Sequence, residues 1–98
     1  MPEQPPPPTY ECWRIRVTCR VQGVSFRAYA KREALRLGLT GTVSNQPDGS
    51  VEIIAEGDKP ALSAFRAWCE VGSPHAKVSA VEVTPAPVSG RHHFTISR

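Results

Sequence analysis

Near residue 25 the spacing of the apolar side chains changes, and this change limits the folds that the chain can adopt. Before it, apolar residues occupy every second position, at Trp13, Ile15, Val17 and Cys19, which is the period of a half-buried strand. After it, they recur at helical spacing, at Phe26, Ala30, Ala34 and Leu37. Gly23 lies in the short connection, and Ser25 is a suitable N-cap residue. The pattern predicts a strand, a tight loop and a helix in direct succession.

The rest of the chain predicts two strands, a second helix and two further strands. Residues 41–45 and 50–56 have strand character, and Gln46-Pro47-Asp48-Gly49 between them is a hairpin turn signal, because Pro presets φ and Gly accepts a positive φ. Pro60 lies near the first position of a helix that runs to about residue 71. Residues 77–83 and 93–97 predict the last two strands.

This order, βαββαβ with a short extra C-terminal strand, predicts an α+β fold. Two right-handed crossovers interleave into one antiparallel sheet with both helices on one face, which is the ferredoxin-like sandwich. The first two strands then run in the same direction, with the third strand between them. We therefore expect the loop 20–24, the start of the first helix and the end of the second strand to meet at one edge of the sheet.

The chain of 98 residues is enough for one domain. Prolines at positions 2 and 5 to 8 predict a disordered tail over residues 1–11, which leaves residues 12–98 for the domain. No apolar run approaches the ~20 residues of a membrane helix, and the N-terminus resembles no secretory signal. We therefore expect a cytoplasmic protein with no membrane partner.

The cysteines and histidines predict neither disulfides nor a metal site. Cys12 and Cys19 are too far apart on one strand to bridge, and the chain contains no Cys-x-x-Cys pair. Cys19 and Cys69 are expected to be small core residues. His92 and His93 are neighbours on a strand and point to opposite faces. We therefore expect no metal and no cofactor.

The expected sheet edge gathers residues suited to a phosphate group. Backbone N–H groups at a helix N-terminus favour an anion, and five residues lead into this one: Gln22, Gly23, Val24, Ser25 and Phe26. Arg27 follows in the first turn, where its charge is mismatched with the helix dipole; a bound dianion would remove the mismatch. Asn45 ends the second strand, and its amide can both donate to and accept from a water molecule.

Each of these features also has an ordinary structural explanation. Many loops between a strand and a helix offer free N–H groups, an arginine on a helix is often simply solvated, and an asparagine before a hairpin is often a turn residue. The net charge of +3 and the pI of about 9.0 favour an anionic partner. They do not choose between a nucleic acid and a small phosphate compound.

A nucleic-acid-binding module is a competing interpretation, because RNA-recognition domains share this element order and stack bases on strand aromatics. Here the outward positions of the first and third strands carry no aromatic residue: Arg14, Arg16, Thr18, Glu52, Ile54 and Glu56. The acidic members of this set are expected to be solvated and to pair with the arginines. This observation argues against a nucleic-acid partner.

Two segments resemble the acylphosphatase family. Residues 17–27, Val-Thr-Cys-Arg-Val-Gln-Gly-Val-Ser-Phe-Arg, are similar to its first signature, whose core is Val-Gln-Gly-Val-x-Phe-Arg. Residues 38–52, which contain Asn45 and the Asp48-Gly49 turn, resemble its second signature. The match covers about residues 13–97, and two motifs at the right separation are far more specific than either alone. One departure is clear, since Cys19 replaces the usual glycine.

The resemblance implies metal-independent hydrolysis of the carboxyl–phosphate bond of acyl phosphates. It implies that Arg27 binds the substrate phosphate together with the loop Gln22 to Phe26, and that Asn45 orients the attacking water. Inorganic phosphate is then the product and an expected inhibitor, and a monomer is the simplest expectation. The alternative is a non-catalytic or accessory acylphosphatase-like domain, of the kind found within larger maturation enzymes. The chain's own Met1 and its retention of Arg27 and Asn45 favour an enzyme.

Overall fold

The structure, a computed structural model, describes residues 10–20 and 25–97. Its elements are β1 (Tyr10–Arg20), α1 (Phe26–Arg36), β2 (Thr40–Asn45), β3 (Val51–Asp58), α2 (Lys59–Val71), β4 (Lys77–Ala86) and β5 (Phe94–Ser97). The expected order of strands and helices is therefore confirmed. β1 starts two residues before the boundary expected between tail and domain, and Tyr10 pairs with Asp58 of β3. The remainder of the expected tail, residues 1–9, lies outside the described residues.

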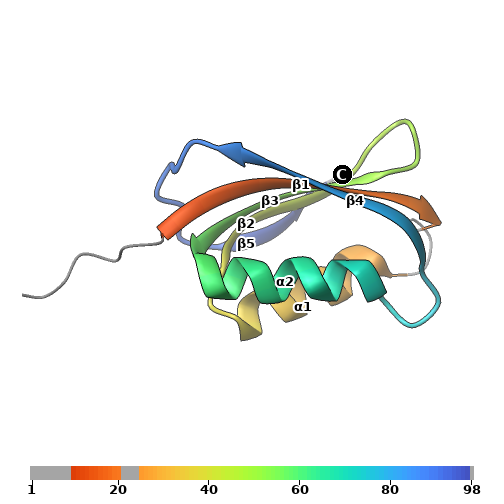
Figure 1. Ribbon diagram of the computed structural model, residues 1–98, viewed down its shortest axis with the longest axis horizontal. Helices are drawn as coiled ribbons and strands as arrows, with labels where there is room; N and C mark the ends of the chain where they lie inside the picture. The colour runs from red at the N-terminus through yellow and green to blue at the C-terminus, as the bar shows by residue number, and fades with distance from the viewer. Residues whose placement is uncertain (1–9, 21–24, 98) are drawn as a thin grey trace, which may run out of the picture.

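The five strands form one sheet in the order β4-β1-β3-β2-β5, and both helices cover the same face of it (Figure 1). β3 lies between β1 and β2, as the ferredoxin-like topology requires. The four strands of the βαββαβ unit are antiparallel to their neighbours. β5 pairs with β2 in parallel, so the complete sheet is mixed, and the expected antiparallel arrangement holds only for those four strands.

The parallel pairing of β5 follows from the path of the chain after β4. β4 is an edge strand beside β1, whereas β5 lies at the other edge beside β2. The chain therefore crosses the end of the sheet through residues 87–93, which run from the end of β4 to the start of β5 (Figure 1). A strand that begins after such a crossing runs in the direction opposite to β4, which is the direction of β2.

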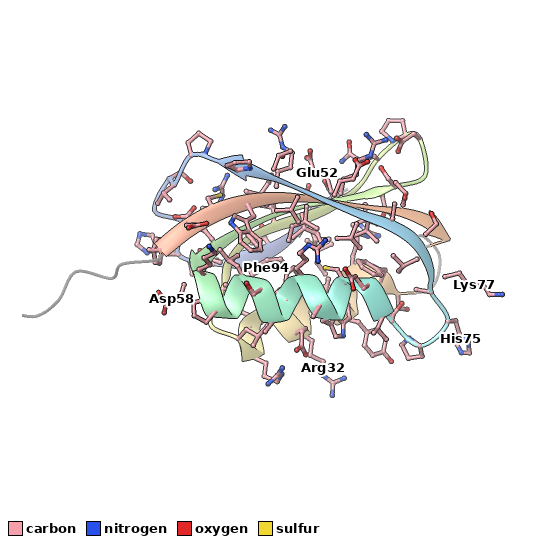
Figure 2. All side chains as sticks on the ribbon, in the orientation of Figure 1. Arg32, Glu52, Asp58, His75, Lys77 and Phe94 are labelled. Carbon is pink, nitrogen blue, oxygen red and sulfur yellow. The ribbon has the colours of Figure 1, made fainter. Side chains whose placement is uncertain are left out.

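The core lies between the sheet and the two helices. Its buried members on α1 are the expected stripe of Phe26, Ala30 and Ala34, and α2 contributes Leu62, Phe65 and Cys69. Four aromatic rings pack between the layers. The ring centroids of Phe26 and Phe65 lie 5.3 and 5.9 Å from that of Trp68, and the centroid of Phe65 lies 6.3 Å from that of Phe94 on β5. Figure 2 shows Phe94 between the sheet and the helices. This packing holds both the N-terminus of α1 and β5 against the sheet.

Neither described helix is long and apolar enough to cross a membrane. α1 ends as expected, because Gly38 has a φ of 76° and the N–H of Leu39 donates to the carbonyl oxygen of Ala34 at 2.9 Å. The expected capping of α1 by Ser25 is wrong. Ser25 occupies the N-cap position, but its backbone is left-handed and its side chain makes no capping hydrogen bond, whereas a capping side chain needs an extended backbone.

Gly41 of β2 is a position where only glycine fits. Its φ is 144°, and a Cβ there would lie 1.7 Å from the carbonyl oxygen of Ile54 on β3. Because that oxygen belongs to the backbone of a central strand, we expect Gly41→Ala to lower the free energy of unfolding by about 2–3 kcal/mol. Denaturation in urea measures the loss.

Gly49 provides the matched control for this substitution. It also has a positive φ, 93°, but a Cβ there would meet nothing within 4 Å. Gly49→Ala should therefore cost only the backbone strain, about 1 kcal/mol. Equal losses for the two variants would contradict the explanation by close approach.

Candidate active site

The ends of β1 and β2 meet at one edge of the sheet, as expected. Val17 of β1 and Asn45 of β2 both pair with Val51, the first residue of β3. α1 begins at Phe26, only a short connection after β1. Of the five residues expected to cradle a phosphate, Ser25 and Phe26 are described, whereas Gln22, Gly23 and Val24 lie outside the described residues. The side chain of Cys19 also lies outside the described part of the chain.

Arg27 projects from the first turn of α1 toward the end of β5. Its guanidinium Nη1 donates a hydrogen bond to the carbonyl oxygen of Ser97 at 2.9 Å. Ser97 in turn pairs with Ser44, the residue directly before Asn45 on β2. The guanidinium is thus held at the sheet edge that Asn45 occupies, and the two residues that the sequence singled out lie at one place in the fold.

Asn45 lies on the inner, helix-facing side of the sheet. Its register partner Val51 and its neighbour Val43 are both fully buried in the core. Its side-chain oxygen Oδ1 is buried and has no hydrogen-bond partner among the described residues. Leaving a buried amide oxygen unpaired costs about 1–3 kcal/mol, so such an atom needs an explanation.

A role in the hairpin turn does not explain Asn45. The turn is held by the N–H of Gln46, which donates to the carbonyl oxygen of Ser50 at 2.8 Å, and by the carboxylate of Asp48. Oδ1 of Asp48 accepts hydrogen bonds from the N–H and the hydroxyl of Ser50 at 2.9 and 2.6 Å. The turn chemistry expected of Asp48 is thereby confirmed, and these hydrogen bonds lower the pKa of its carboxyl group, with a further contribution from Arg16.

The N-terminus of α1 is electropositive. Ser25 does not cap it with a side-chain hydrogen bond, and its first turn contains no acidic residue. Ser25 has a φ of 60° and a ψ of 27°, a left-handed conformation that is strained for a residue with a side chain and is often found at functional sites. N–H groups that the Ser25 side chain does not cap, the helix dipole and the Arg27 guanidinium together favour an anion at this point.

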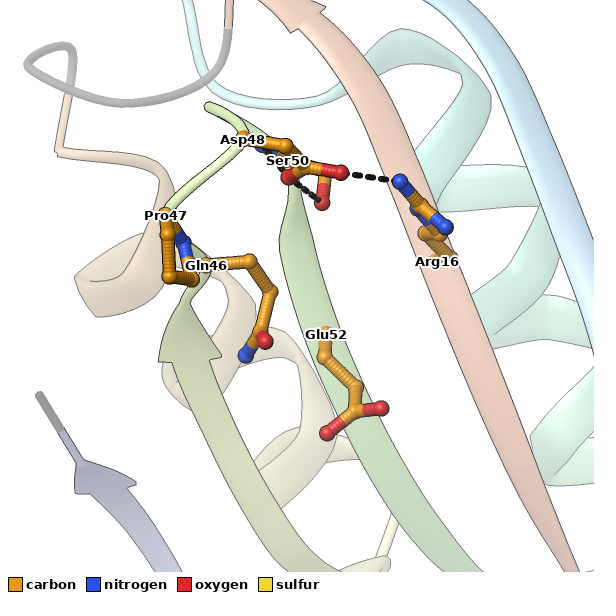
Figure 3. A pocket seen from close by; sticks show the side chains of 6 residues that line it. All are labelled: Arg16, Gln46, Pro47, Asp48, Ser50 and Glu52. Atoms are coloured by element: carbon orange, nitrogen blue, oxygen red, sulfur yellow. Dashed lines mark hydrogen bonds and ion pairs between the residues drawn. The ribbon is translucent and has the colours of Figure 1, made fainter.

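The opposite face of the sheet carries a separate, polar hollow of about 270 Å³ under the hairpin (Figure 3). It is lined by Arg16, Gln46, Pro47, Asp48, Ser50 and Glu52. Arg16 forms an ion pair with Asp48, and Nε of Arg14 lies 3.5 Å from Oε2 of Glu52. The expected pairing with an arginine of β1 is therefore confirmed for Glu52, which pairs with Arg14. Arg16 pairs instead with Asp48 of the turn, and Glu56 pairs with Arg91 rather than with a β1 arginine. Neither Arg27 nor Asn45 lines this hollow.

Two further observations concern metal-ligating and acidic side chains. Within residues 10–20 and 25–97 no group of three or more His, Cys, Asp or Glu side chains is placed to hold a metal ion. The expectation that Glu56 is solvated is wrong. Its side chain is fully buried, because residues 89–91 fold over the outer face of the sheet and bind its carboxylate. Nothing in the sequence near Glu56 signals this contact.

Comparison with known proteins gives consistent matches. The family model for acylphosphatase matches residues 13–96. An acylphosphatase of Synechococcus sp. (strain WH7803) is 49% identical over 90% of this chain and 88% of its own length. The crystal structure of acylphosphatase from Bacillus subtilis aligns with a TM-score of 0.86 at 43% identity, covering 89% of this chain and 98% of that one. An acylphosphatase structure from Coxiella burnetii aligns with a TM-score of 0.88 at 32% identity, covering 92% of this chain and 95% of that one.

Proposed function

Since the chain belongs to the acylphosphatase family and is an enzyme that hydrolyses acyl phosphates, we propose that Arg27 and Asn45 are its catalytic residues. Arg27 binds the substrate phosphate and Asn45 orients the attacking water, with no metal ion or cofactor. The observation that carries this assignment concerns Oδ1 of Asn45, which is buried, has no hydrogen-bond partner among the described residues, and lies at the sheet edge where Arg27 is held.

Arg27 supplies the positive charge that a phosphate dianion needs. A guanidinium carries several N–H donors in a planar fork that suits phosphate oxygens, and the bond to Ser97 uses only Nη1. The backbone N–H groups of the loop Gln22 to Phe26 complete the cradle in this proposal. In phosphoryl transfer most of the rate enhancement comes from positioning and from stabilising charge on the transferred group, and this arrangement provides both.

Asn45 acts on the water. Its buried oxygen Oδ1 accepts one hydrogen bond from the water, which turns a lone pair of the water toward the phosphorus. The leaving group is a carboxylate, whose conjugate acid has a pKa of about 4 to 5, so it departs without a general acid. The substrate's own phosphate accepts the proton of the attacking water, because neither the guanidinium of Arg27 nor the amide of Asn45 can act as a base.

The competing functions are less well supported. In a nucleic-acid-binding module the arginines of the open sheet face would be free for phosphates, but Arg14 and Arg16 are paired with acidic side chains. An accessory domain within a larger enzyme is not favoured, because the relatives at 46–53% identity over most of the chain are acylphosphatases of similar length. A monomer in the cytoplasm remains part of the proposal, and the free thiols of Cys12 and Cys69 suit that reducing compartment.

The test is hydrolysis of benzoyl phosphate by the purified protein in EDTA. We expect full turnover without added metal, competitive inhibition by inorganic phosphate, and a monomer by sedimentation. The pH profile of kcat/KM should show only the ionisation of the substrate phosphate. Loss of activity in EDTA, or an essential enzyme group that titrates near neutrality, would contradict the proposed mechanism.

A further inference from the structure

A buried carboxylate lies at the end of the sheet remote from the candidate site. Glu56 of β3 is 0% exposed, although it occupies the face of the sheet that the helices leave open. Its Oε2 accepts a hydrogen bond from the N–H of Gly90 at 2.8 Å. Its Oε1 accepts from the N–H of Ser89 at 3.2 Å, from the Ser89 hydroxyl at 3.5 Å and from Nη1 of Arg91 at 3.2 Å.

All four donors belong to the segment that connects β4 to β5. This segment must cross the end of the sheet, because Ala86 at the end of β4 lies beside Cys12 of β1, and Cys12 lies beside Glu56. On its other side Glu56 lies beside Thr40, and the next residue, Gly41, pairs with Phe94, the first residue of β5. Glu56 thus stands midway along the crossing and holds the segment where it turns toward β5.

The carboxylate is kept ionised in this buried place. Burial raises the pKa of Glu56, but the hydrogen bonds from Gly90, Ser89 and Arg91 outweigh that effect and hold the pKa below its ordinary value. Burying a charge is unfavourable unless it is paired and hydrogen-bonded. The donors of residues 89–91 and the carboxylate therefore stabilise one another, and neither is well satisfied without the other.

β5 is a short edge strand that begins just after this segment. It has four residues and pairs only with β2. Its first residue, Phe94, follows the bound segment by three positions, and its last residue, Ser97, accepts the hydrogen bond from Arg27. The distance along the strand between these two ends is about 10 Å, so a shift of the segment would move the Ser97 carbonyl relative to the guanidinium.

We propose that Glu56 is a positioning residue for the active site, since its carboxylate anchors residues 89–91, sets the place of β5 and thereby holds the guanidinium of Arg27. This inference rests on the proposed role of Arg27 in phosphate binding. In this proposal Glu56 affects substrate affinity from the far end of the sheet, without contacting the substrate.

The decisive variant is Glu56→Gln, which keeps the size of the side chain but replaces one acceptor oxygen by an N–H₂ donor facing other donors. We expect the dissociation constant of inorganic phosphate, measured by calorimetry, and the KM for benzoyl phosphate to rise about tenfold. Amide hydrogen exchange should accelerate in β5 and not in β1 or β3. Activity and binding are measured at a temperature at which circular dichroism shows the variant to be folded.

Glu52→Gln is the matched control, because Glu52 lies on the same strand and the same open face (Figure 2) but pairs with Arg14. It should leave phosphate affinity unchanged. If Glu56→Gln does not fold, Arg91→Ala replaces it, since this change removes one donor and leaves the backbone donors of Ser89 and Gly90; phosphate affinity should then fall about threefold.

Two further measurements separate the possible failures. If Arg27→Ala itself retains phosphate binding, the proposed function of Arg27 fails. If Arg27→Ala loses phosphate binding but a folded Glu56→Gln or Arg91→Ala protein binds phosphate as the wild type does, the positioning role of Glu56 is overturned. A loss of kcat without any change in KM or phosphate affinity would likewise overturn it.

Discussion

Arg27→Ala is expected to lower kcat/KM for benzoyl phosphate by about 10³-fold or more, the effect that a charge-stabilising arginine has in phosphoryl transfer. The guanidinium is held at the end of β2 by its hydrogen bond to Ser97, where it can contact the transferred group directly. The variant should also lose measurable affinity for inorganic phosphate, because the remaining donors at the helix N-terminus carry only partial charges. Steady-state kinetics and calorimetry measure the two effects.

Two substitutions make this test specific. Arg27→Lys keeps the charge but replaces the planar fork by a point charge, so it should recover only part of the phosphate affinity and little of the rate. Arg32→Ala removes a charge from the same helix at an exposed side chain that points away from the sheet (Figure 2), and it should retain near wild-type kinetics. If Arg32→Ala were as damaging as Arg27→Ala, general electrostatic attraction rather than direct contact would explain the result.

Asn45→Ala is expected to lower kcat by about 10²- to 10³-fold, the loss typical of removing one oriented polar group from an active site, while phosphate affinity stays close to that of the wild type. The loss of kcat without a loss of phosphate affinity follows from the proposed roles, since Asn45 contacts the water and not the phosphate. Because Oδ1 is buried and has no partner among the described residues, its removal should not lower the melting temperature and can raise it.

Asn45→Asp sharpens this prediction. The substitution preserves shape but places a negative charge beside the bound dianion, so phosphate affinity should fall together with kcat. Ser44→Ala is the control from the adjacent position, whose hydroxyl accepts a hydrogen bond from Gln46 at 3.1 Å; its kinetics should be unchanged. A clear loss of stability in Asn45→Ala would indicate instead that Asn45 is a structural residue of the hairpin.

Local patterns predicted most of the fold because they depend on near neighbours in the chain. The alternation in β1 and the helical stripe of α1 indicate which side of each element faces the core. The structure buries Ile15 and Val17 of the first pattern and Phe26, Ala30 and Ala34 of the second, and Trp13 is partly buried. The hairpin after Asn45 follows from Pro47 and Gly49 in the same way. The meeting of β1, α1 and β2 at one edge followed from element order together with the handedness of crossovers.

Predictions were less successful where the backbone conformation of one residue or a distant contact decided the outcome. Ser25 was expected to cap α1 from its residue type, but its left-handed backbone turns the side chain away from that role. Glu56 was expected to be solvated because it alternates with core residues on β3. Its burial depends on residues 89–91, more than thirty positions later, and no local period records such a contact.

The amino-acid sequence by itself determined the order of the elements, the inner and outer faces of the strands, and the two residues, Arg27 and Asn45, that carry the proposed chemistry. These properties arise from side-chain period, turn residues and motif spacing, which are local. Only the tertiary structure decided that β5 runs parallel to β2, that Ser97 accepts a hydrogen bond from Arg27, and that residues 89–91 bind Glu56. It also buries Oδ1 of Asn45 where no other described residue pairs with it. Each of these features depends on segments that packing brings together from distant parts of the chain. Whether a hydrogen bond forms there depends on the three-dimensional geometry, which the spacing of residues along the chain does not determine.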